Sequence, residues 1–300
     1  MFNLPNGVDL NQLIDDLKQY SWSASDILIN YSKKVKNNQF RYDFIKNKEN
    51  NDPVTQADLD VNNFIIENLQ NKYTNKDWDI LSEETINLKS GKRIITNWLW
   101  ILDPLDGTKD FIQRTGNYAM HLALNYRDKP VIGIVLIPER NELWIANGKQ
   151  VWCENKNGTR KKHNLSKSRN LETMTVVTSK NHRNEELHNL IKNVGFNRSL
   201  QMGSIGCKVA SILRGEADIF ISLSLAGKSA PKDWDFAAPE AILKQAGGAI
   251  TTIDNQDLIY GQEGFRQQGL IIASNNKQNH EFICLEFKKI LKNNFKSLDL

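Results

Sequence analysis

The chain has 300 residues, of which 40% are hydrophobic, which is enough for one large core or two closely packed domains. Its 39 basic and 35 acidic residues give a net charge of +4, and no basic stripe interleaved with aromatic residues is present, so nucleic acid is not expected as a partner. Three widely spaced cysteines argue against a disulfide framework, and no 18-residue apolar span occurs, so we expect a cytoplasmic protein without membrane contact.

Apolar residues in the first part of the chain recur at helical spacing. They predict a long helix over about residues 13–35 and a second helix over about residues 58–73, with Asp58 in its first turn. Between these helices, three alternating aromatic residues indicate a strand, namely Phe40, Tyr42 and Phe44.

An acidic turn of sequence D-P-L-D-G-T directly follows an apolar run. The proline fixes its own φ and Gly107 tolerates positive φ, so the backbone can fold back and bring Asp103 and Asp106 to one side. Two anions this close repel each other unless a cation lies between them, and hard oxygen ligands suit Mg²⁺, Mn²⁺ or Ca²⁺. Thr108 would begin a short helix whose N-terminus favours a phosphate oxygen. Alone, the turn is equally well interpreted as a strand-to-helix corner.

Three other acidic segments strengthen the metal interpretation. Asp58 is one, the pair Glu83 and Glu84 after a short strand is the second, and Asp235 at the start of a helix that ends near residue 247 is the third. The alternatives are a solvated loop for the glutamate pair and a helix N-cap role for Asp235.

The remaining elements divide the chain into two halves. Residues 118–152 contain alternating or apolar strands with an Asn-Gly hairpin turn, which predicts antiparallel sheet. After residue 162 strands and helices alternate: strands at 175–178, 218–222, 249–253 and 270–273, and helices at 184–194, 208–214, from 235 and after 275. We therefore expect an α+β half, residues 1–162, with most metal ligands, and an α/β half, residues 163–300, with Asp235 and the leaving-group site. The active site should lie at their junction.

These segments together resemble the inositol monophosphatase family of Mg²⁺-dependent, lithium-sensitive phosphomonoesterases. The resemblance runs from about residue 9 to residue 275, and D-P-x-D-G-T followed roughly 125 to 130 residues later by W-D-x-A-A is its specific joint signal. It implies an α+β fold with a layered α/β/α/β/α sandwich of the sugar phosphatase type and with mixed and antiparallel sheets. It also implies two to three Mg²⁺ ions and a small phosphorylated metabolite as the partner; the oligomeric state is left open.

The resemblance further implies a role for each acidic residue. Glu83, Asp103 and the carbonyl of Leu105 would hold one metal ion, Asp103, Asp106 and Asp235 a second, and Asp58 with Glu83 a weaker third. Thr108 would help to activate the attacking water, and Asp58 and Glu83 would complete the catalytic group. Two ions of this kind lower the pKa of a bound water and stabilise the leaving oxygen, so no Ser, Cys or His nucleophile is required. The common sequence motifs for such nucleophiles are indeed missing.

The leaving-group site is less clearly indicated. Inositol phosphatases have a glutamate before the W-D motif, whereas residues 219–232 contain no acidic residue and include Lys228 and Lys232. This favours an anionic leaving group, such as one that carries a second phosphate. The alternative is that both lysines are solvated surface charges.

A glycine-flanked serine points to the same class of substrate. The segment from Gly203 through Ser204 to Lys208 is similar to the nucleoside-contacting turn of 3'(2'),5'-bisphosphate nucleotidases, the CysQ branch. That branch often reads G-S-S-x-K, whereas here Ile205 and Gly206 intervene and Lys208 is displaced by one position. A helix start with Ser204 as its cap is the alternative.

The sequence as a whole therefore predicts an enzyme that hydrolyses the 3'-phosphate of adenosine 3',5'-bisphosphate, or of its sulfated relative, to leave the 5'-phosphate. The expected substrate contacts are Gly107, Thr108, Gly203, Ser204, Lys208, Lys228, Lys232 and Asp235. A phosphatase for inositol 1-phosphate or another small sugar phosphate is the alternative within the family, and a non-catalytic phosphate-binding relative is the alternative outside catalysis.

Overall fold

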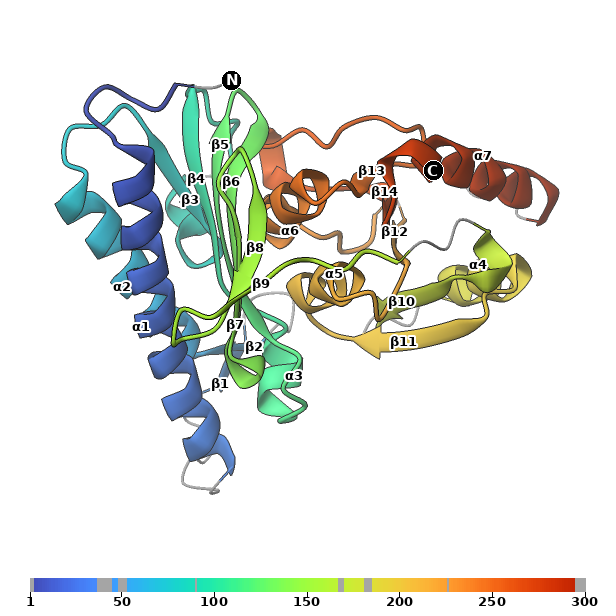
Figure 1. Ribbon diagram of the computed structural model, residues 1–300, viewed down its shortest axis with the longest axis horizontal. Coiled ribbons are helices and arrows are strands. Elements are labelled where there is room, and N and C mark those ends of the chain that lie inside the picture. Colours follow the sequence, from blue (N-terminus) through green and yellow to red (C-terminus); the bar gives the residue numbers. More distant parts are fainter. Residues whose placement is uncertain are drawn as a thin grey trace.

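A computed structural model describes residues 3–36, 45–47, 53–89, 91–166, 170–180, 185–225 and 227–294. These residues form five layers in the order helices, sheet, helices, sheet, helices (Figure 1). The expected α+β sandwich with mixed sheets is therefore confirmed.

The first layer consists of the helices α1 (Leu10–Lys36) and α2 (Gln56–Lys72). Both turn an apolar stripe toward the first sheet, as the helical spacing in the sequence predicts. The strand expected at Phe40, Tyr42 and Phe44 lies outside the described residues. The short strand β1 (Ile45–Asn47) pairs with β2 (Pro53–Thr55), which leads into α2.

The first sheet has seven strands in sequence order, and only the β3–β4 pair is parallel. The strands are β3 (Asp79–Ser82), β4 (Trp98–Asp106), β5 (Ala119–Tyr126), β6 (Lys129–Ile137), β7 (Glu142–Ala146), β8 (Val151–Glu154) and β9 (Arg160–Lys161). The 3-10 helix η2 (Glu83–Lys89) follows β3 directly. The predicted antiparallel sheet with its hairpin between β7 and β8 is thus confirmed.

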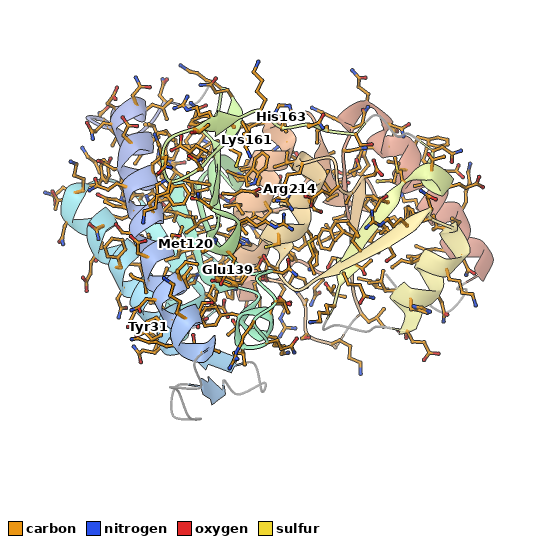
Figure 2. The ribbon with its side chains drawn as sticks, turned by 60° about the horizontal axis from the view of Figure 1, so that its bottom comes forward. Tyr31, Met120, Glu139, Lys161, His163 and Arg214 are labelled. Carbon is orange, nitrogen blue, oxygen red and sulfur yellow. The ribbon has the colours of Figure 1, made fainter. Side chains whose placement is uncertain are left out.

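The two faces of this sheet contact different helices. Met120 on β5, labelled in Figure 2, belongs to the core between the sheet and the helices α1 and α2. Because side chains alternate along a strand, its neighbour His121 points to the opposite face.

The middle layer covers that opposite face with α5 (Ile205–Leu213) and α6 (Asp233–Gln245). α6 packs against β4, β5, β6 and β7. Arg214, labelled in Figure 2, lies at the end of α5. Its Nη1 donates a hydrogen bond of 2.8 Å to Glu142 on β7, which connects the helix to the first sheet.

The second sheet has the strand order β11-β10-β12-β14-β13 and combines parallel with antiparallel pairs. Its strands are β10 (Thr175–Ser179), β11 (Arg198–Met202), β12 (Ile219–Ser224), β13 (Ala249–Thr252) and β14 (Gly269–Ser274). α4 (Glu185–Val194) and α7 (Lys277–Asn294) cover its outer face (Figure 1). No helix within these described ranges combines the length and the apolar character needed to cross a bilayer.

Candidate active site

Three carboxylates from distant parts of the chain meet between the first sheet and α6. Asp103, Asp106 and Asp235 each offer one oxygen within 4.8 Å of the others. Asp103 and Asp106 lie at the end of β4, where the pairing with β5 shifts register between them, and Asp235 is the third residue of α6. The fold therefore brings together the two aspartates of the D-P-L-D-G-T turn and the aspartate of the W-D motif.

The turn after β4 directs both of its carboxylates to this cluster. Gly107 has φ +89°, a left-handed conformation that favours glycine, and the short helix α3 (Thr108–Ile112) begins directly after it. The backbone N–H of Leu105 donates to Asp103 Oδ1 at 3.0 Å and fixes that side chain. The turn therefore connects a strand to a helix, and it also contributes two carboxylates to the acidic cluster.

Asp58 approaches the cluster from the first turn of α2. Its Oδ2 accepts hydrogen bonds from Thr55 N at 2.8 Å and from Thr55 Oγ1 at 2.5 Å, which caps the helix. The hydroxyl of Thr108 lies 3.5 Å from Asp58 Oδ1 and donates to the carbonyl of Leu105 at 3.1 Å. Asp58, Thr108 and the Leu105 carbonyl thus lie side by side.

Glu83 is the first residue of η2 and is half-buried. Its negative charge raises the pKa of Asp58, of Asp103 and of Asp235, which shows that it belongs to the same electrostatic cluster. Glu84 raises the pKa of Asp58 as well. The assignment of Glu83 as a metal ligand stays a prediction.

The carboxyl groups of the cluster repel one another strongly. Burial, followed by the charges of Glu83 and Asp106, raises the pKa of Asp103 well above its usual range. Burial and the charge of Asp106 do the same to Asp235, and burial with the nearby glutamates raises the pKa of Asp58 to about 7. A bound cation would relieve this repulsion, and clustered carboxylates beside a backbone carbonyl are the oxygen ligands that suit Mg²⁺ or Ca²⁺. The residues therefore fit a hard divalent cation.

Asp106 is the exception in this cluster. Burial alone would raise the pKa of its carboxyl group, but the close approach of His121, the charge of Lys208 and a hydrogen bond from Ser204 together lower it. Ser204 Oγ donates to Asp106 Oδ2 at 2.5 Å, Gly206 N donates to the same atom at 3.0 Å, and His121 Nε2 lies 3.1 Å from it. Asp106 is therefore held ionised by its surroundings.

The turn expected to contact the substrate is packed against this carboxylate. Ser204 caps α5 by accepting a hydrogen bond of 3.0 Å from Cys207 N, as the alternative interpretation proposed, and it is fully buried. Lys208 is also buried; its Nζ donates to Gly203 O at 2.7 Å, and burial lowers its pKa to about 8. The substrate contacts assigned to this turn stay predictions.

The two lysines before α6 differ in their environments. Lys228 is exposed, whereas Lys232 is half-buried at the N-cap of α6 and its Nζ donates to Gly264 O at 2.7 Å. The backbone N–H of Lys232 donates to Asp235 Oδ2 at 2.5 Å, so Asp235 completes a capping box rather than serving as the N-cap itself.

His121 is the member of the site that the sequence motifs do not indicate. It is fully buried on β5, directly opposite Asp103 in the strand pairing. The one available signal is an isolated polar residue between the apolar residues Met120 and Leu122, which is unusual for a core strand.

Comparison with known proteins gives consistent matches over the whole fold. The family model described as "Inositol monophosphatase family" matches residues 9–292. A 3'(2'),5'-bisphosphate nucleotidase CysQ from Buchnera aphidicola is 30% identical over 252 residues, which cover 83% of this chain and 88% of that protein. The CysQ protein of Escherichia coli K12 is 29% identical over 233 residues, which cover 76% and 88% of the two chains.

Solved structures with the same fold include the suppressor protein suhB from Bartonella henselae, with a TM-score of 0.70, 22% identity and coverage of 95% of this chain and 100% of that one. An IMPase/NADP phosphatase complexed with NADP and Ca²⁺ gives a TM-score of 0.73 at 21% identity, with coverage of 97% and 98%. A Ca-bound IMPase family protein from Staphylococcus aureus gives 0.71 at 21% identity, with coverage of 96% and 97%.

Proposed function

Because this chain belongs to the inositol monophosphatase family, we propose that it is a Mg²⁺-dependent 3'(2'),5'-bisphosphate nucleotidase that converts adenosine 3',5'-bisphosphate to AMP and phosphate. The observation that carries the chemistry is the convergence of Asp103, Asp106 and Asp235 within 4.8 Å. The matches to CysQ proteins over most of the chain support the choice of substrate class.

The metal ligands follow from this cluster. We assign Asp103, Asp106 and Asp235 to one ion, Glu83, Asp103 and the Leu105 carbonyl to another, and Asp58 with Glu83 to a weaker third. Bound divalent cations would supply a water of lowered pKa and would neutralise charge on the phosphoryl oxygens. The raised pKa values of Asp103 and Asp235 support this assignment, because such carboxyl groups are stabilised as anions by a neighbouring cation.

We assign activation of the attacking water to Thr108. Its hydroxyl lies 3.5 Å from Asp58 Oδ1, so the hydroxyl oxygen can accept a proton from the water as the hydroxyl passes its own proton to that carboxylate. In the metal-free protein, burial and neighbouring charge raise the pKa of Asp58 to about 7. Gly107 and Thr108 would also face a phosphate oxygen of the substrate.

The second phosphate of the substrate is assigned to the strip before α6. This strip contains no acidic residue between Asp218 and Asp233, and its Lys228 is exposed and therefore accessible to an anionic ligand. Lys232 is half-buried at the start of α6, three residues before Asp235. We further propose a cytoplasmic location, in keeping with the three cysteines, which are all unpaired.

The substrate is tested by side-by-side turnover of adenosine 3',5'-bisphosphate, inositol 1-phosphate and fructose 1,6-bisphosphate with Mg²⁺. We expect the adenosine compound to give a kcat/KM at least about tenfold higher than the other two, equivalent to about 1.4 kcal/mol of transition-state discrimination. Equal rates on the adenosine and inositol compounds would refute the substrate but leave the phosphatase chemistry intact.

The site is tested by Asp106→Asn, with the exposed Asp254→Asn as a matched control. Asp106→Asn should lower kcat by about 100-fold or more, because it removes one anionic ligand from the proposed metal centre. Asp254→Asn should act like the unmodified protein. Phosphate release that survives Asp106→Asn at full rate, or that survives complete chelation of divalent metal, would refute the mechanism.

A further inference from the structure

We propose that His121 is a positioning residue for the metal-binding carboxylates, and that Gly206 is present because the His121 ring occupies the space where a side chain would lie. The positioning role of His121 rests on one feature of the proposed function, namely that the carboxylates bind a cation. The second part concerns packing and is independent of any activity.

The His121 ring connects the two segments that carry the clustered carboxylates. His121 lies opposite Asp103 in the β4–β5 pairing, and its Nε2 is 3.1 Å from Asp106 Oδ2. Its Nδ1 is 3.2 Å from the backbone oxygen of Trp234, the residue before Asp235. One buried ring thus links the end of β4 to the start of α6.

The chemistry of these contacts indicates what the ring does. A carboxylate and a carbonyl only accept hydrogen bonds, so a ring N–H is the group that can interact favourably with either of them. Ser204 Oγ and Gly206 N donate hydrogen bonds to one oxygen of Asp106, and His121 Nε2 lies 3.1 Å from the same oxygen, at ion-pair distance but without the alignment of a hydrogen bond. Rotation of the Asp106 carboxylate would break both hydrogen bonds and move this oxygen away from the ring, so the three neighbours together limit the orientation that the carboxylate presents to a cation.

Gly206 provides an independent observation. It lies in the first turn of α5, where glycine is less favourable than alanine, and it is not among the glycines with positive φ. A Cβ added there would lie 2.2 Å from His121 Nε2, and 2.9 Å from both His121 Cδ2 and Val135 Cγ1. Gly206 is therefore required by the space that the ring fills and not by its backbone conformation.

A double-mutant cycle tests both parts, with His121→Ala, Gly206→Ala and their combination. Mg²⁺ affinity is measured by calorimetry, and the melting temperature of the metal-free protein reports packing. We expect His121→Ala to weaken Mg²⁺ binding about tenfold. We expect Gly206→Ala to lower the melting temperature, and the double variant to recover most of that loss, because Val135 can relax into the space that the ring leaves. His121→Gln, which keeps an N–H donor, should bind Mg²⁺ within about threefold of the unmodified protein.

The outcomes separate the two parts from each other and from the proposed function. Unchanged Mg²⁺ affinity in His121→Ala, or equal losses in His121→Ala and His121→Gln, would overturn the positioning role. Additive losses of melting temperature in the double variant would overturn the pairing. If His121→Ala does not fold, the cycle is run with His121→Asn. If the unmodified chain binds Mg²⁺ but releases no phosphate from any substrate, the proposed function fails while the inference about His121 stands.

Discussion

At the scale of single residues, the surroundings of Asp58 disfavour the ionised form of its carboxyl group. Burial, with further contributions from Glu83 and Glu84, raises its pKa to about 7, although two hydrogen bonds from Thr55 oppose the shift. The folded protein therefore binds more protons at this group than the unfolded chain between about pH 4 and pH 7. The protonated Asp58 carboxyl group therefore contributes to the free energy of unfolding at low pH, and this contribution is lost as the pH rises through that window.

Replacement by an uncharged side chain of the same shape should remove this loss. We expect metal-free Asp58→Asn to match the unmodified protein near pH 4 and to be more stable near pH 8 by about 2 to 4 kcal/mol, because each pKa unit corresponds to about 1.4 kcal/mol. Chemical denaturation at both pH values in the presence of a chelator measures this difference. A difference that does not change with pH would show that Asp58 is not the group that titrates.

The residues of the site differ in how far the sequence could predict them. Asp103 and Asp106 lie in one short turn, so local geometry alone brings them together, and Asp58 and Asp235 each stand in the first turn of a helix that periodicity predicts. The position of His121 depends on the register between β4 and β5, which no local pattern specifies. The inward direction of Lys208 depends in the same way on how α5 packs.

At the scale of elements, the turn after β4 and the start of α5 are fitted to each other. Gly107 has φ +89°, and a Cβ at this position would lie 3.0 Å from Asn117 O and 3.1 Å from Ser204 Cβ. The glycine therefore serves two purposes, a left-handed conformation and a close approach between the two segments that surround Asp106.

A pair of alanine substitutions separates these purposes. Gly158 has a similar φ of +80° but no atom within 4 Å of an added Cβ, so Gly158→Ala measures the backbone strain alone. We expect Gly107→Ala to lower the free energy of unfolding by about 1 to 3 kcal/mol more than Gly158→Ala, because it adds displacement of the Ser204 turn to the strain. Equal losses, measured by urea denaturation, would mean that the approach of α5 does not constrain Gly107.

Physical reasons explain why the sequence-based prediction missed one strand and shortened one helix. β11 is an edge strand with mostly exposed polar residues and lacks the alternation that reveals a half-buried strand. α5 begins at Ile205, three residues before the predicted start, because Ser204 caps it and the glycine in its first turn weakens the helical pattern.

At the scale of the whole molecule, the middle helices bind the two parts of the chain together. The largest core cluster contains residues of β4, β5 and β7 together with residues of α5, α6 and the second sheet. α6 is buried on nearly every side from Phe236 to Leu243, which is typical of a helix enclosed between two layers. Periodicity predicted the elements, but the order of the layers followed only from the family resemblance. The proposed division at residue 162 separates two halves that each have a core cluster of their own and that share the core cluster between the two sheets and the cluster of carboxylates.

The central claim is that carboxylates from both parts of the chain form one binding site for divalent cations. The most direct measurement is an anomalous difference map from a crystal of the protein grown with Mn²⁺, which substitutes for Mg²⁺ on oxygen ligands. We predict at least one strong peak within coordination distance, about 2.1 Å, of oxygens from Asp103, Asp106 and Asp235 together. A map from a crystal grown with saturating Mn²⁺ that shows no peak among these three residues, or that shows Mn²⁺ only elsewhere, would contradict the account.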